Sequence, residues 1–347
     1  MNVTISRWLV LGVVLSIPSA SFGQLFGGLF RGPERTASLP ENSGSHFTEA
    51  PDRSGIHMSS GVVPGTGTLL NKAFDDFENE DWVYAYKLPK SSHEQDKNRR
   101  YPLGGSNNGL WQESAKRGTP DHVVRVATPA GGLPGSTGAM KIQTLNSGIP
   151  GLTSYEPQQD DLILNLSSKY GRIPVYRIPN VVVRIWMPPF EEWEERSGSH
   201  FGVRMALGTT KVTKERRIIF KRTVEEAESY WPGFFIQYTS KKDGHPKDGA
   251  MFLIRGANNG GDFPGPAITQ TGWWTLGMTA NPNGSVSFYA SPGVDPLKAA
   301  DHIATTLPYS YRAENFSTMF FNVTSANNGR TWSTPFIVDD PMVFTAR

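Results

Sequence analysis

An arginine stands in the middle of each of two apolar, alternating segments of this sequence. Residues 181–187 read VVVRIWM and residues 201–207 read FGVRMAL, a pattern typical of neighbouring strands in one sheet. Because successive side chains of a strand point to opposite sides, Arg184, Trp186 and Arg204 are expected on the face away from the core. A guanidinium group binds carboxylate or sulfate with two parallel hydrogen bonds, and a flat aromatic ring stacks on the apolar face of a sugar. The pattern therefore predicts a polar ligand surface.

Two later segments extend this predicted surface. Gln237 lies in GFFIQY and Arg255 lies in AMFLIRG, and alternation places both on the outer side of their strands. The predicted ligand-binding residues are thus Arg184, Trp186, Arg204, Gln237 and Arg255. The alternative is that the arginines pair with acidic loop residues under a covering segment and so hold long loops to the sheet.

The sequence lacks the motifs of several enzyme classes. The histidines show no HxH or HExxH spacing, and no nucleophile elbow, phosphate-binding loop or dinucleotide fingerprint stands in a fitting context. There is no cysteine, which excludes a thiol nucleophile and a disulfide framework. The acidic cluster at 191–195 follows two prolines, so we expect an exposed loop rather than the paired carboxylates of a glycosidase.

Short strands are the elements that would position these side chains. Gly 36 and Pro 26 are spread along 347 residues, which favours many strands joined by turns. Alternation predicts strands at 122–128, 139–145, 160–167, 233–238, 250–256, 273–280, 285–290, 319–324 and 336–344. The predicted fold class is an all-β antiparallel β-sandwich of the jelly-roll type. The charged stretch 208–231 is expected to be a solvated hairpin or short helix, with a basic binding finger as the alternative.

The first 23 residues have the layout of a secretory signal peptide. Arg7 precedes an apolar run at 8–17, and small residues lead to a cleavage site after Gly23. The run is too short to cross a bilayer, although a single membrane anchor is the alternative. Residues 24–70 are rich in Gly, Ser and Pro and predict a disordered linker before a β-sandwich domain at 71–347.

These features also bear on location and partners. The signal peptide predicts a secreted, periplasmic or extracellular protein. The net charge of +2 indicates no nucleic-acid partner, and we expect no stable membrane insertion.

Three segments together resemble the concanavalin-A-like lectin/glucanase superfamily. They are the acidic and aromatic opening FDDFENEDW at 74–82, the Trp-led pair GWWTLGMTANPNGSVSFYASPGV at 272–294, and the closing strand FIVDDPMV at 336–343. The opening and closing segments are almost as similar to galactose-binding-like carbohydrate modules. The resemblance covers about 74–347 and implies a jelly-roll sandwich in which the opening and closing strands are neighbours.

The resemblance implies a carbohydrate partner, with an anionic polysaccharide as one candidate, bound through the outer face of one sheet. The alternative is a polysaccharide lyase that cleaves a uronate-containing glycan by β-elimination, with His200 and Tyr238 as weak catalytic candidates. The R-x-E-L and Q-I-H strings usual in such lyases are absent from this sequence. A third possibility is a structural envelope protein without a small ligand.

Five carboxylates stand on the implied neighbouring strands: Asp75, Asp76, Glu78, Asp339 and Asp340. A Ca²⁺ ion takes six to eight oxygen ligands, and two adjacent strands can supply part of that set. Structural Ca²⁺ is therefore the candidate cofactor. The alternative is that these acids cap strand ends and accept backbone N–H groups.

Overall fold

The computed structural model describes residues 61–347 except 99, 102, 153–157 and 218–219, with backbone alone at 214–217 and 220–222. The predicted signal peptide and the linker up to residue 60 lie outside the described residues.

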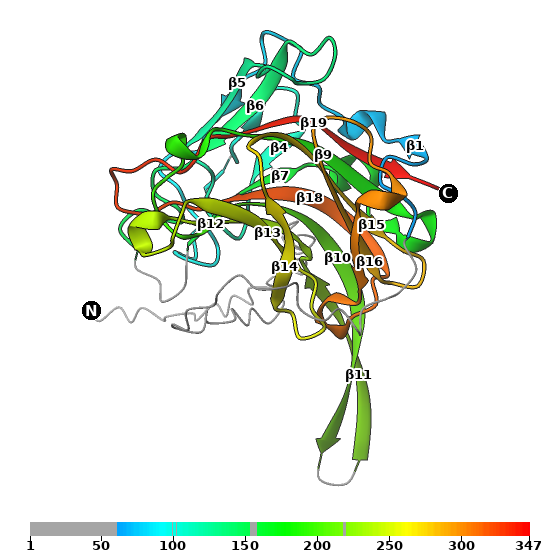
Figure 1. Cartoon of the computed structure of the whole chain (residues 1–347). Coiled ribbons are helices and arrows are strands. Elements are labelled where there is room, and N and C mark those ends of the chain that lie inside the picture. The colour runs from blue at the N-terminus through cyan, green and yellow to red at the C-terminus, as the bar shows by residue number, and fades with distance from the viewer. Residues whose placement is uncertain (1–60, 99, 102, 153–157, 218–219) are drawn as a thin grey trace, which may run out of the picture.

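Two antiparallel sheets pack face to face (Figure 1). Sheet A has the order β17 (His302–Thr306), β16 (Val286–Pro292), β15 (Gly272–Ala280), β9 (Pro179–Met187), β19 (Phe336–Thr345), β6 (Gly138–Gln143) and β5 (His122–Ala127), and β1 (Thr68–Leu69) also pairs with β19.

Sheet B has the order β14 (Asp262–Ile268), β13 (Gly249–Arg255), β12 (Gly233–Thr239), β10 (Gly198–Arg217), β18 (Asn315–Val323), β7 (Asp160–Leu164), β4 (Trp111–Glu113), β3 (Gly105–Ser106) and β2 (Tyr84–Ala85). The strands β11 (Phe220–Tyr230) and β8 (Ile173–Pro174) pair with β10 and β18. The predicted all-β antiparallel sandwich is confirmed.

The helices of the described residues are all short. They are η2 (Asn71–Ala73), α2 (Ser167–Tyr170), η3 (Val175–Arg177), η4 (Phe190–Glu192), η5 (Lys241–Asp243), η6 (Ala299–Asp301) and η7 (Pro308–Ser310). None of the described helices is long and apolar enough to cross a membrane.

Stacked aromatic rings join the two sheets. Phe201 of β10 stacks on Phe336 of β19 with ring centroids 4.7 Å apart, and on Phe321 of β18 at 5.6 Å. All three side chains are fully buried. Such pairs add to the stabilisation that burial of apolar area already provides, so this stack lies at the centre of the core.

The two arginine-bearing strands belong to different sheets, which corrects the expectation that they are neighbours. β9 pairs with β15 and β19 in sheet A, whereas β10 pairs with β12 and β18 in sheet B. The intervening residues 188–197, which include η4, cross from one sheet to the other. Alternation correctly predicts which side chains face the core, but it carries no information about which sheet a strand joins.

The folded domain begins before residue 71, which corrects the predicted linker boundary. The backbone N–H of Gly65 donates to Asn180 Oδ1 at 2.8 Å, and Thr279 Oγ1 donates to the carbonyl of Val62 at 2.7 Å. β1 then pairs with β19. Residues 61–70 therefore pack against sheet A as part of the sandwich.

The charged stretch after residue 207 forms a long hairpin, so the hairpin alternative is confirmed and the helix alternative is wrong. β10 and β11 pair continuously from Leu207 opposite Tyr230 to Arg217 opposite Phe220. We call the paired segments 208–217 and 220–229 the ribbon. Figure 1 shows that it projects away from the two sheets.

Candidate functional site

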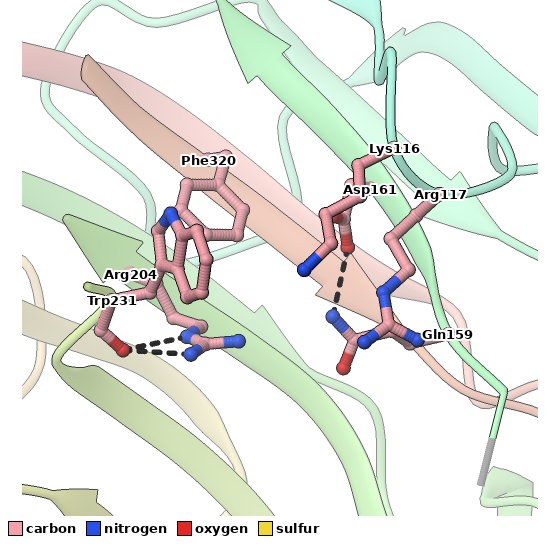
Figure 2. A pocket seen from close by; sticks show the side chains of 7 residues that line it. All are labelled: Lys116, Arg117, Gln159, Asp161, Arg204, Trp231 and Phe320. Carbon is pink, nitrogen blue, oxygen red and sulfur yellow. Dashed lines mark hydrogen bonds between the residues drawn. The ribbon is translucent and has the colours of Figure 1, made fainter. Parts of the chain in front are cut away.

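A small pocket opens on the outer face of sheet B (Figure 2). Three neighbouring strands supply its floor, because Arg204 lies on β10, Phe320 on β18 and Asp161 on β7. The residues that line it are Lys116, Arg117, Gln159, Asp161, Arg204, Trp231 and Phe320. Figure 2 shows Arg204, Trp231 and Phe320 on one side and the other four on the opposite side.

Arg204 is a buried cation, with only 5% of its surface exposed. Its Nε and Nη2 groups donate to the carbonyl oxygen of Trp231 at 3.0 and 2.7 Å, and its guanidinium lies 5.5 Å from the ring centroid of Phe320. It forms no ion pair with a carboxylate in the described part of the chain. Burial, assisted by the nearby charge of Arg255, lowers the pKa of Arg204 to about 10, so the group stays protonated at neutral pH. Asp161 and Asp262 act on this charge only from beyond ion-pair distance, so the charge stays incompletely compensated until an anion binds.

Asp161 supplies the carboxylate on the other side of the pocket. Asn322 Nδ2 and Gln159 Nε2 donate to its Oδ1 at 2.6 and 3.1 Å. Burial raises the pKa of Asp161 above the ordinary value, although Arg117, Arg204 and Lys116 act in the opposite direction. The carboxylate is thus held by two amides and can accept a hydroxyl hydrogen from a ligand.

Lys116 and Arg117 make the mouth of the pocket positive. The ammonium group of Lys116 lies 4.8 Å from the ring centroid of Trp231, and Glu94 contacts Lys116 at 3.9 Å and Arg117 at 3.1 Å. Three cations and one carboxylate therefore line the pocket itself. The space in the pocket that a water-sized group can occupy is about 20 Å³, which has room for a water molecule or one oxygen of an acidic group, not for a sugar ring. A larger ligand would lie across the open face around it.

Two further predicted residues extend this face beyond the pocket. Arg255 of β13 forms a two-point ion pair with Asp262 at 2.9 and 3.1 Å, and its guanidinium lies 4.8 Å from the ring centroid of Phe235. Gln237 of β12 accepts a hydrogen bond from Ser199 Oγ at 3.1 Å. Arg204, Gln237 and Arg255 therefore share the outer face of sheet B, as their alternation predicts.

Arg184 and Trp186 lie on the outer side of sheet A, so the prediction that all five residues form one surface is wrong. Arg184 Nε donates to the carbonyl of Val294 at 3.0 Å, which ties the 293–297 loop to the sheet. Trp186 is half-buried and packs beside Trp273 and Ile337. For Arg184, the alternative that an arginine holds a loop to its sheet fits the structure better than ligand binding.

His200 and Tyr238 point into the core between the sheets. The β10 strand carries a bulge between Ser199 and Phe201, which turns His200 inward. His200 Nε2 donates to the carbonyl of Arg196 at 2.7 Å, and Nδ1 accepts from Thr334 Oγ1 at 2.7 Å. Burial, and then the charge of Arg196, lower the pKa of His200 to about 3.

The ring of Tyr238 packs on Trp193 at 5.0 Å, and burial raises its pKa to about 12. Since both side chains are packed between the sheets, neither His200 nor Tyr238 can act as a base for a ligand on an outer face.

The opening segment 74–82 is irregular, with one turn at Glu80–Asp81, rather than a strand, and Asp75, Asp76 and Glu78 accept hydrogen bonds from protein groups. Asp75 is buried, and its Oδ2 accepts from the indole N–H groups of Trp82 and Trp111 at 3.0 and 2.9 Å. Asp76 accepts from the backbone N–H of Glu78 at 3.1 Å. Glu78 in turn accepts from the backbone N–H of Thr137.

The five predicted calcium ligands do not form a metal site. Asp339 accepts from Ser136 Oγ at 2.9 Å and from the backbone N–H of Asp340 at 2.9 Å. Within residues 61–347, gaps aside, no group of three or more histidines or acids is arranged to hold a metal ion. The capping alternative describes Asp75, Asp76 and Glu78 better than a calcium site does.

Sequence reasoning missed most of the pocket residues. Lys116 and Arg117 lie in a polar stretch without alternation, and Trp231 follows the charged hairpin. Asp161 lies in a segment correctly predicted as a strand, but one aspartate in a strand does not by itself indicate a binding site. Its role in the site follows from the buried Arg204 on β10, which lies two strands away across β18, and that position depends on the order of strands in sheet B.

Neither a family model nor a curated protein matches this sequence. Among solved structures, the chain is similar to a carbohydrate esterase of the Shiga toxin-encoding bacteriophage phi24B, with 10% identity, a TM-score of 0.37, and 69% of this chain and 91% of that chain covered. It is similar to an endo-β-1,4-glucuronan lyase from the fungus Trichoderma reesei, with 10% identity, a TM-score of 0.32, and coverage of 65% and 91%. It is also similar to the carbohydrate recognition domain of Emp47p, with 9% identity, a TM-score of 0.34, and coverage of 80% and 97%.

These three likenesses all have TM-scores below 0.4 and identities of 10% or less. At this identity and these TM-scores the likeness supports no argument about activity or binding residues. The site is therefore argued from its own side chains.

Proposed function

We propose that this protein binds an acidic carbohydrate through the outer face of sheet B, with a carboxylate or sulfate of the ligand at Arg204. The observation that carries this proposal is the burial of the Arg204 guanidinium without a carboxylate partner in the described part of the chain. The Trp231 carbonyl fixes the orientation of the guanidinium, so little order is lost when an anion binds.

The surroundings of Arg204 favour a sugar acid over a simple inorganic anion. The rings of Trp231 and Phe320 line the pocket beside the guanidinium, and the buried ring of Phe235 packs against Arg204 on the same side of the sheet. Aromatic surface suits the apolar face of a sugar ring, and Asp161 and Gln159 suit its hydroxyl groups. Lys116 and Arg117 can bind a second acidic group of a repeating polymer.

The test measures binding of the mature protein to polygalacturonate and alginate, with neutral starch and xyloglucan as comparison, by affinity electrophoresis and calorimetry. Arg204→Met keeps the apolar stem and removes the charge, so binding to the acidic polymers should weaken about tenfold or more. Arg184→Met, on the other sheet, is the matched control and should leave binding unchanged. Equal binding by Arg204→Met and wild type would show that the pocket is not the site.

A binding role is favoured over cleavage by the composition of the pocket. Its lining contains no imidazole or phenol, and it contains a single carboxylate, Asp161. If the lyase alternative were right, incubation with uronate polymers would give unsaturated products that absorb in the ultraviolet. We expect no such products.

An exported location, which residues 1–23 predict, is part of this proposal. N-terminal sequencing of the protein recovered outside the cytoplasm should give a chain that starts at Gln24.

A further inference from the structure

The ribbon formed by β10 and β11 leaves one strand edge unpaired. Beyond Gly208, β10 pairs only with β11, and β11 pairs with no other strand among the described residues. Figure 1 shows the ribbon clear of both sheets. The second edge of β11 therefore presents backbone N–H and carbonyl groups that another strand can bind.

The ribbon is buried at its base, at Thr209 and Ser229, and is largely open to solvent farther from the sheets. Lys211, Val212 and Thr213 are exposed, and Val212 has 57% of its surface accessible. An isolated pair of strands is marginally stable in water, and three or more strands are needed for independent stability. The ribbon is ten residue pairs long, from Gly208 opposite Ser229 to Arg217 opposite Phe220, and would gain stability from added strands.

Two copies of β11 that run in opposite directions are complementary in charge. Its first half carries Lys221 and Arg222, and its second half carries Glu225, Glu226 and Glu228. In an antiparallel pair of two β11 strands, the basic half of one copy lies beside the acidic half of the other. Opposite charges directly across an antiparallel pair are stabilising.

We propose that the free edge of β11 pairs antiparallel with β11 of a second copy of this chain, about a twofold axis at Val224. In this register Arg222 of one copy stands opposite Glu226 of the other. Within each chain, β10 places Glu215 opposite Arg222 and Lys211 opposite Glu226. Across the four strands, each row therefore reads Glu215 and Arg222 of one copy, then Glu226 and Lys211 of the other, so the charges alternate. The twofold axis generates two such rows. A register centred on Glu225 would instead place Glu225 directly opposite Glu225 of the second copy, where the two carboxylates repel each other.

The absence of cysteine from the sequence makes a direct test possible. Val224→Cys places a thiol at the twofold axis, where directly opposed residues have the spacing that a disulfide needs. Mild oxidation should convert this variant largely to a covalent dimer. Val212→Cys, on β10 of the same ribbon, is the matched control and should stay monomeric on a denaturing gel. Equal cross-linking of the two variants, or none in either, would overturn the proposal.

A charge exchange tests the register and separates pairing from folding of the ribbon. Arg222→Glu and Glu226→Lys each remove both opposite-charge pairs of the dimer, so each variant alone should associate about fivefold more weakly in sedimentation velocity. A mixture of the two variants restores one pair as Glu with Lys and keeps the other as Arg with Glu. The mixture should therefore form a heterodimer that neither variant forms with itself. Failure of the mixture to associate more tightly than the separate variants, or a wild type that stays monomeric at every attainable concentration, would exclude this register.

Discussion

Arg184 on β9 and Asp339 on β19 stand directly opposite each other, both buried, yet their side chains form no hydrogen bond with each other. Arg184 donates to the carbonyl of Val294, and its Nη1 has no hydrogen-bond partner among the described residues. Burial raises the pKa of Asp339 to about 6, and burial together with Asp339 raises that of Asp340 to about 6. At neutral pH both carboxylates are ionised, and the surrounding groups compensate their negative charge only in part.

The pair Asp339 and Asp340 should contribute more to the free energy of unfolding at pH 5, where it is partly protonated, than at pH 7, where both carboxylates are charged. Because the folded pKa values exceed the ordinary aspartate value of 3.8, the folded state binds more protons than the unfolded state between about pH 4 and 6. The contribution to stability is therefore present at low pH and is lost as pH rises through 6. Asp340→Asn removes one of the two charges and should raise the free energy of unfolding at pH 7 by about 1–2 kcal/mol. Urea unfolding at both pH values measures this. An unchanged difference between the two pH values in Asp340→Asn would contradict it.

His200 should act in the opposite direction over an overlapping range. Its folded pKa of about 3 lies below the ordinary histidine value of 6.5, so the unfolded state binds more protons and stability falls as pH drops below 6.5. His200→Asn cannot take up the proton. The His200→Asn variant should be less stable than wild type at pH 7. Between pH 7 and pH 5, however, its free energy of unfolding should fall by about 1–2 kcal/mol less than that of wild type. A variant with the same pH dependence as wild type would show that His200 does not titrate on unfolding.

Asp75 is expected to anchor the opening segment by accepting two buried indole N–H groups. Asp75→Ala leaves Trp82 and Trp111 without that acceptor, which should destabilise the fold by about 3 kcal/mol. Asp76→Ala is the matched control, because Asp76 is exposed, and its cost should stay below about 1 kcal/mol. Equal losses in the two variants, measured by urea unfolding, would argue against this role.

The residue pattern predicts the sandwich and the core faces well, because alternation with period two is a property of each strand alone. Arg204, Gln237 and Arg255 are placed correctly on an outer face for this reason. The site as a whole could not be predicted, because it depends on contacts between strands far apart in sequence. Asp161 and Arg204 meet only through β18, and the bulge that turns His200 inward follows from pairing with β12. Strand order and bulges are set by tertiary packing, and neither has a local signature here.

Calcium should have no effect on the thermal midpoint. Asp75, Asp76, Glu78 and Asp339 accept hydrogen bonds from protein N–H or hydroxyl groups, and no group of three or more acids or histidines among the described residues is arranged to hold a metal ion. Melts in millimolar calcium and then in excess chelator should coincide. A higher midpoint with calcium would return Asp339 and Asp340 to consideration as ligands.

Residues 61–70 should be required for full stability, so the protease-resistant core should start near Gly61 rather than near Phe74. Removing this segment leaves three buried polar groups of sheet A without their partners: the Asn180 side chain, which binds Gly65 and Thr66, and the hydroxyl groups of Thr279 and Tyr289, which donate to Val62 and Gly61. It also removes β1 from the edge of β19 and the buried side chain of Leu70.

A chain that starts at residue 71 should therefore unfold with a free energy lower by about 3–5 kcal/mol than a chain that starts at residue 61. The chain that starts at residue 61 is the matched control, since both lack the predicted linker. Limited proteolysis followed by mass determination of the resistant fragment gives an independent readout. Equal stability of the two truncated chains would mean that residues 61–70 contribute little to the fold.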